Sequence, residues 1–204
     1  MSGARKILVA GVGNIFLGDD GFGVEVARRL AGESPPGGVT VADFGIRGVH
    51  LAYELLEGYD TTILVDAAPR GGEPGTVYVV EVDVDDPGAG IPSERAGEEG
   101  ALVDAHGMEP QAVFGLLRAL GAAAGRVLVV GCEPAEVTDR IGLSDPVARA
   151  VDEAVRVVGE LVRDELGEAS SGAWGGAGVG KARRGSGGSS SEAVAPGSLE
   201  GGGA

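Results

Sequence analysis

Two adjacent carboxylates, Asp19 and Asp20, lie in the glycine-rich turn that follows the first buried strand of this sequence. Paired acids at that place suit a cation at the carboxyl edge of a sheet, whereas they repel the phosphate that a nucleotide-binding protein holds there. One acid could instead cap the following helix, whose N-terminus favours negative charge. Capping accounts for one acid, and Asp19 is the better candidate for it, which leaves Asp20 for chemistry.

Two further side chains complete a candidate metal site. Asp66 ends an apolar strand, where a carboxylate is either held by backbone amides or used in chemistry. His106 follows a long polar segment, although a lone histidine is often structural. Because ligands of α/β sheets gather at the carboxyl ends of the strands, we expect Asp20, Asp66 and His106 to meet there. Two carboxylates and one imidazole suit nickel, zinc or iron with open coordination positions.

Strand and helix patterns alternate along the chain, which predicts an α/β fold. Strands are predicted at 5–11, 39–43, 62–66, 75–82 and 126–131, and helices at 20–30, 49–56, 109–120 and 144–166. The apolar residues of the helix at 109–120, including Leu120, are expected to face inward. The fourth strand follows the third too closely for a crossover helix, so we expect it to be antiparallel to its predecessor or on an edge. The expected architecture is a three-layer αβα sandwich with a mostly parallel five-stranded sheet and one antiparallel strand.

The chain has 204 residues, of which 1–166 are predicted to form one α/β domain. Residues 167–204 are rich in Gly and Ser, and we expect a disordered tail in which Trp174 is solvated. The acidic segment 83–105 is predicted to be a long surface loop, and such loops are often functional.

Composition excludes several classes of function. The formal net charge of −15 argues against binding to nucleic acid or to an anionic membrane. The single cysteine excludes an intramolecular disulfide and a multi-thiolate zinc site. No apolar run approaches the about 20 residues that span a bilayer, and no signal-peptide pattern is present, so we expect a cytoplasmic protein.

A dinucleotide-binding protein is the first alternative. Gly11 and Gly13 begin a dinucleotide fingerprint after a strand, and Asp43 ends the next strand, where a ribose-binding acid belongs. However, Phe16 stands in place of the third glycine, and the acids of the turn would repel a pyrophosphate.

Covalent catalysis is the second alternative. Cys132 follows a strand, but no basic residue accompanies it and Glu133 would raise its pKa, so a buried thiol is expected. Ser144 is expected to cap the last helix, and His50 to lie on the surface or beside the site.

Several motifs resemble those of the hydrogenase maturation proteases, the endopeptidases that remove a C-terminal extension from the large subunit of nickel–iron hydrogenases. In chain order they are Gly11-Val-Gly-Asn14, Leu17-Gly-Asp-Asp20-Gly-x-Gly23, Leu64-Val-Asp-Ala67, Asp104-Ala-His-Gly107, Gly131-Cys-Glu-Pro134 and Ile141-Gly-Leu-Ser144. The resemblance covers about residues 5–163, and the tail has no counterpart in it.

This resemblance implies that Asp20, Asp66 and His106 contact nickel and carry catalysis, without a catalytic Ser or Cys. It implies that the nickel arrives in the hydrogenase large-subunit precursor and is not a resident cofactor. The segments Asp104-Ala-His-Gly-Met108 and Asp43-Phe-Gly-Ile-Arg47-Gly48 depart from better-known members, which suggests a different hydrogenase partner. A water polarised by the metal or deprotonated by a carboxylate would attack the scissile carbonyl. The alternative is a non-catalytic checkpoint or chaperone module that binds the precursor without cutting it.

Overall fold

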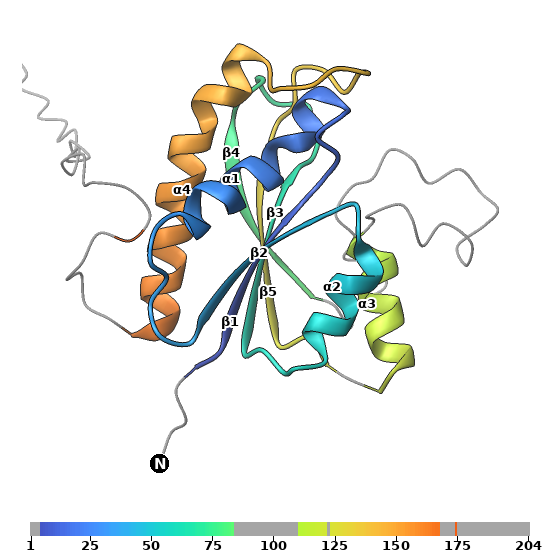
Figure 1. Ribbon diagram of the computed structural model, residues 1–204, viewed down its shortest axis with the longest axis vertical. Coiled ribbons are helices and arrows are strands. Elements are labelled where there is room, and N and C mark those ends of the chain that lie inside the picture. Colours follow the sequence, from blue (N-terminus) through green and yellow to red (C-terminus); the bar gives the residue numbers. More distant parts are fainter. Residues whose placement is uncertain (1–4, 84–109, 122, 168–173, 175–204) are drawn as a thin grey trace, which may run out of the picture.

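The computed structural model describes residues 5–83, 110–121, 123–167 and 174, which build a β-sheet between two pairs of helices (Figure 1). The strands are β1 Ile7–Val12, β2 Val39–Gly45, β3 Thr61–Ala67, β4 Val77–Val82 and β5 Arg126–Cys132. The helices are the short 3₁₀-helix η1 Gly18–Gly21, then α1 Phe22–Ala31, α2 Gly48–Leu55, α3 Pro110–Ala119 and α4 Asp145–Leu166.

The strand order is β2-β1-β3-β5-β4, with four parallel strands and β4 antiparallel to β5 at the edge. This confirms the predicted αβα sandwich. The fourth strand is antiparallel and on an edge, as expected, but it does not pair with its predecessor because β5 lies between β3 and β4. The carboxyl ends of β1, β2, β3 and β5 therefore share one edge, from which the loops after these strands emerge.

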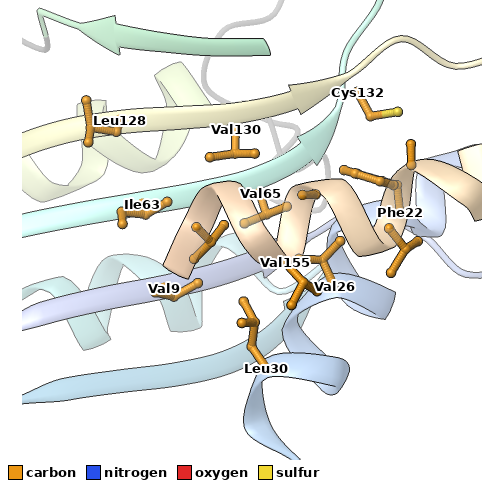
Figure 2. Packing of buried hydrophobic residues seen from close by; sticks show 14 of the residues in the cluster. Val9, Phe22, Val26, Leu30, Ile63, Val65, Leu128, Val130, Cys132 and Val155 are labelled. Atoms are coloured by element: carbon orange, nitrogen blue, oxygen red, sulfur yellow. The ribbon is translucent and has the colours of Figure 1, made fainter. Parts of the chain in front are cut away.

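Alternating side chains of the strands supply two cores, one on each face of the sheet. Figure 2 shows Val9, Val65 and Val130 pointing from the strands towards Val26 of α1 and Val155 of α4. On the other face, Leu8, Leu64 and Val129 pack with residues of α2 and α3, among them Leu51, Val113 and Leu117. Burying each such side chain contributes about 1.5–3 kcal/mol. This packing fixes the helix ends relative to the carboxyl edge.

Two predictions about burial are wrong. Trp174 is only 8% exposed and packs against the α1–α4 core, and its carbonyl oxygen accepts a hydrogen bond from Arg163 Nη1 at 2.9 Å. The large apolar area of an indole ring offsets the ordering of a short chain segment. Leu120, expected to face inward, is 46% exposed because α3 ends at Ala119.

Residues 84–105 of the predicted loop, and the predicted tail apart from Gly167 and Trp174, lie outside the described residues. Within the described part of the chain, no helix is long and apolar enough to cross a membrane.

Candidate functional site

Glycines let the start of α1 lie directly on the sheet. A Cβ built on Gly23 would come within 2.0 Å of the Val65 carbonyl oxygen and 2.4 Å of the Val12 carbonyl oxygen. A Cβ on Gly11 would lie 2.2 Å from the Gly23 oxygen. Only residues without a side chain permit this approach. The glycines thus have a packing role, and they bring η1, which carries Asp19 and Asp20, to the ends of β1 and β3.

Asp66 is the penultimate residue of β3. Its neighbours Val65 and Ala67 face the α1–α4 core, so Asp66 points to the face covered by α2 and α3. Burial and the negative charge of Asp20 raise the pKa of Asp66 to about 7, although a hydrogen bond from the Ala67 N–H opposes part of the increase. The segment η1, which carries Asp20, lies against β3, and the charge of Asp20 acts on Asp66. Asp20 and Asp66 therefore lie in the same region of the carboxyl edge, while their role in metal binding or catalysis stays a prediction.

Asp20 does not cap α1. The N-cap position of that helix is Gly21, and no side chain makes a capping hydrogen bond there. Instead, Asp20 Oδ2 accepts a hydrogen bond from the Asn14 N–H at 2.7 Å. The chain turns at Gly13 with φ of 119°, and a Cβ there would lie 1.8 Å from the Asp20 carbonyl oxygen. The turn after β1 therefore fixes the position of this half-buried carboxylate.

Asp19 is structural, but it does not cap the following helix as predicted. It is fully buried and accepts hydrogen bonds from the N–H groups of Ala135 at 2.8 Å, Glu136 at 3.1 Å and Ser144 at 2.6 Å. The Ser144 hydroxyl also donates to it at 2.8 Å. Burial alone would raise the pKa of Asp19, but these hydrogen bonds together lower it. Asp19 thus holds the loop between β5 and α4 against the first turn.

Ser144 has the N-cap position of α4, as expected, yet its side chain does not cap the helix. Its hydroxyl donates to Asp19 instead. Sequence spacing identified the helix start, whereas the partner of the hydroxyl depends on a contact across 125 residues of sequence.

Tyr78 and Gly131 form a surface beside Asp66 that sequence reasoning missed. Gly131 of β5 pairs with Asp66 of β3 on one side and with Tyr78 of β4 on the other side. The ring of Tyr78 covers the glycine, since a Cβ there would lie 2.2 Å from Tyr78 Cζ. Burial raises the pKa of Tyr78 to about 12, so its hydroxyl stays protonated and donates to the Ala68 carbonyl oxygen at 2.7 Å. A glycine at the end of a valine-rich strand was the available signal.

The two alternative chemistries find no support. Cys132 is fully buried, and burial together with the charges of Asp19 and Glu133 raises the pKa of its thiol to about 12, which confirms the expected inert thiol. Asp43 forms an ion pair with Arg28 at 3.3 Å. His50 is exposed, as expected for a surface residue, and lines an open pocket between β2 and α2.

His106 lies outside the described residues, so the third member of the predicted site is not placed. Among the described residues, no group of three His, Cys, Asp or Glu side chains is arranged to hold a metal ion. Asp20 and Asp66 are therefore the two members of the predicted site whose positions the structure describes.

Comparison with known proteins identifies the relatives of this chain. Residues 24–160 match the model of the family HycI, hydrogenase maturation protease. This match includes Asp66 and His106 and begins after Asp20. A relative in Methanocaldococcus jannaschii, whose name assigns it to hydrogenase maturation proteases, is 36% identical over 162 residues, covering 77% of this chain and 97% of its own length.

Two further relatives extend the comparison. The hydrogenase expression/formation protein HupD of Bradyrhizobium diazoefficiens is 32% identical, with 76% of this chain and 79% of that protein covered. The solved structure of the hydrogenase maturating endopeptidase HybD from E. coli has a TM-score of 0.65 at 26% identity, covering 79% of this chain and 94% of that one.

Proposed function

Because this chain belongs to the hydrogenase maturation protease family, and is therefore a peptidase, we propose that it removes the C-terminal extension of a nickel-loaded [NiFe] hydrogenase large-subunit precursor. In this proposal, Asp20, Asp66 and His106 contact the nickel of the precursor. The metal belongs to the substrate and is not a resident cofactor. The observation that carries the proposal is that η1, which carries Asp20, lies against β3, which carries Asp66, at the carboxyl edge of the sheet.

The carboxylate pair suits both metal contact and proton transfer. Two like charges held close together gain from a shared cation, which removes their mutual repulsion. In the cleavage step, the oxygen of a water bonds to the scissile carbonyl carbon while a carboxylate of the pair takes its proton. The proton then passes to the departing nitrogen as the C–N bond breaks. Asp66 has a pKa of about 7, which is suitable for proton exchange near neutral pH.

Chain connectivity supports the inclusion of His106. β4 is antiparallel to β5, so it ends at the edge of the sheet opposite the carboxyl edge, where β5 starts. α3 leads to the start of β5, so its last residues lie towards that opposite edge. Its first residue, Pro110, is therefore the end of α3 nearer the carboxyl edge. α3 also packs on the face of the sheet to which Asp66 points. His106 precedes Pro110 by four residues, which span at most about 14 Å. We therefore include His106 as the third residue of the proposed site.

The surroundings of the pair suit a polypeptide substrate. Three loops that emerge at the carboxyl edge carry exposed apolar side chains: Phe16 is 62% exposed, Ile46 is 51% exposed and Ile141 is 76% exposed. Backbone hydrogen bonds join the first and third of these loops, because the Arg140 N–H donates to the Phe16 carbonyl oxygen at 3.0 Å. Exposed apolar side chains favour contact with a polypeptide, because burying them against a partner removes apolar surface from water.

The test follows the mass of the purified precursor, nickel-loaded or nickel-free, after incubation with this protein. We expect loss of the extension only from the loaded precursor. Asp20→Asn, Asp66→Asn and His106→Ala should each slow cleavage at least about 100-fold, the size of a lost general acid–base group. Asp43→Asn is the matched control, because Asp43 also lies near the end of a parallel strand but pairs with Arg28.

Two outcomes would contradict the proposal. A stable complex in which the wild-type protein leaves the loaded precursor intact would favour the binding module. Wild-type rates in the Asp20 and His106 variants would show that these side chains do not carry the reaction.

A further inference from the structure

Arg70 lies in the connection between β3 and β4, four residues after Asp66. Its backbone N–H donates to Glu133 Oε2 at 2.7 Å, and the Gly71 N–H donates to Glu133 Oε1 at 3.2 Å. Glu133 is itself only 6% exposed. A buried carboxylate therefore fixes the backbone from which the Arg70 side chain extends.

The guanidinium of Arg70 is held over the ring of Tyr78, with Cζ 4.9 Å from the ring centroid. The ring cannot shift freely, because its hydroxyl donates to the Ala68 carbonyl oxygen at 2.7 Å and its face lies on Gly131. A cation over a fixed aromatic ring loses less conformational freedom when it binds a ligand than a free arginine does. Arg70 is thus held over a ring that lies in the same row of the sheet as Asp66, with Gly131 between them.

The hydrogen-bonding capacity of this guanidinium is unused within the described part of the chain. The other arginines at the carboxyl edge have partners: Arg47 donates to the Asp43 and Phe44 carbonyl oxygens, and Arg140 pairs with Glu136. Both oxygens of the nearby Glu133 accept backbone N–H groups. Arg70 is exposed and makes no ion pair with a described residue. Five N–H donors of fixed planar geometry remain for a ligand.

We propose that Arg70 binds the side-chain carboxylate of an Asp or Glu residue close to the scissile bond of the precursor. This rests on the proposed function. A planar guanidinium matches a carboxylate with two parallel hydrogen bonds. The chain has a net charge of −15, which repels acidic groups in general. A fixed cation in the sheet row of Asp66 therefore offers an acidic substrate group one favourable position. Arg70 therefore selects where the peptide lies, while the carboxylate pair performs the reaction.

A second explanation of Arg70 is that it only offsets the negative charges of Asp66 and Glu133. The two explanations differ in what changes when Arg70 is neutralised. Loss of a substrate contact raises KM for the precursor and leaves kcat and its pH midpoint unchanged. Loss of an offsetting charge shifts the pH midpoint of kcat upward, because the carboxylate pair then binds its proton more tightly.

The experiment measures kcat and KM for the nickel-loaded precursor with Arg70→Gln, Arg70→Lys and the control Arg149→Gln. Arg149 is an exposed arginine of α4, so the control removes the same charge away from Tyr78. We expect KM to rise about tenfold or more for Arg70→Gln, in line with a lost charge-assisted hydrogen bond. Arg70→Lys should recover part of the loss, because the charge remains but the planar fork does not.

The second arm neutralises each Asp and Glu within ten residues of the cleavage site of the precursor, one at a time. One such precursor should show the raised KM with the wild-type protein and no further rise with Arg70→Gln, since both changes remove the same contact. Three outcomes would overturn the assignment. One is an unchanged KM for Arg70→Gln, and another is a shifted pH midpoint of kcat without a change in KM. The third is that Arg70→Gln raises KM by the same factor for every neutralised precursor.

The proposed function can fail separately from this inference. If the wild-type protein binds the precursor without cutting it, the same combinations of Arg70→Gln and neutralised precursors are compared by the Kd of the complex. Cleavage by the wild-type protein with no dependence on Arg70 would overturn the inference alone.

Discussion

Asp19 and Ser144 are joined by two hydrogen bonds across 125 residues of sequence, one from the serine N–H at 2.6 Å and one from its hydroxyl at 2.8 Å. The adjacent carboxylate, Asp20, contacts the turn after β1 and interacts with Asp66. Two identical, neighbouring side chains therefore have different roles. Asp19 stabilises the loop that leads into α4, and Asp20 belongs to the candidate site.

Replacement of Asp19 should weaken folding. Asp19→Ala leaves three backbone N–H groups without their acceptor, and we expect the free energy of unfolding to fall by about 3–5 kcal/mol. Ser144→Ala removes only the hydroxyl contact and should cost about 1 kcal/mol. Urea unfolding measures both, with Asp139→Ala as the control because Asp139 is an exposed acid of the same loop. Equal stabilities of the Asp19 and Asp139 variants would contradict this role.

The two carboxylates with shifted pKa values should give opposite pH dependences of stability. Asp19 has a lowered pKa in the folded protein, so its contribution is present above its unfolded pKa of about 4 and is lost as the pH falls. Asp66 has a pKa raised to about 7, so the folded state binds the extra proton between about pH 4 and 7 and stability falls as the pH rises through that window.

Asp66→Asn should therefore stabilise the protein at pH 8, by about 2 kcal/mol after allowance for partial exposure, although it should slow cleavage at least about 100-fold. At pH 4 the stabilities of the variant and the wild-type protein should converge. Thermal or urea unfolding at the two pH values measures the difference. A variant that is less stable than the wild type at pH 8 would show that the Asp66 carboxylate is not destabilised in the folded protein.

Two helical glycines provide a matched test of the contact between α1 and the sheet. Gly23→Ala places a methyl group about 2 Å from two carbonyl oxygens, so α1 has to move away from β1 and β3. We expect a loss of about 3 kcal/mol or more in unfolding free energy and reduced cleavage, since Asp20 moves with the helix start. Gly115→Ala in α3 meets no atom within 4 Å and should stabilise the protein by about 0.5–1 kcal/mol.

Unchanged cleavage by a folded Gly23→Ala protein would mean that the site tolerates displacement of α1. Destabilisation of similar size in both glycine variants would indicate an effect of helix composition and not of the close approach.

Cys132 should be dispensable for catalysis. The thiol is buried and its pKa is raised to about 12, so it is not a thiolate at neutral pH. We expect Cys132→Ala to retain at least half of the wild-type kcat, and iodoacetamide to leave the folded protein active. Rapid inactivation by the reagent, together with protection by the precursor, would instead indicate a nucleophilic cysteine.

The sequence by itself determined the layer order of this protein and the edge of the sheet at which Asp20 and Asp66 lie. Continuous apolar runs separated by amphipathic segments specify a covered parallel sheet, because both faces of such strands are buried. Since parallel strands end at one edge, a residue near the end of a strand, such as Asp66, and a residue in the turn after a strand, such as Asp20, are brought to the same edge by topology.

The tertiary structure decided what local patterns leave open. Asp19 and Asp20 have the same local sequence signals, and only the position of the loop from β5 to α4 gives one of them buried hydrogen-bond donors. The contact of Tyr78 with Gly131, the place of Arg70 over that ring and the burial of Trp174 likewise depend on which distant segments pack together. Sequence periodicity describes one element at a time, whereas these contacts are set by the packing of several elements around the sheet.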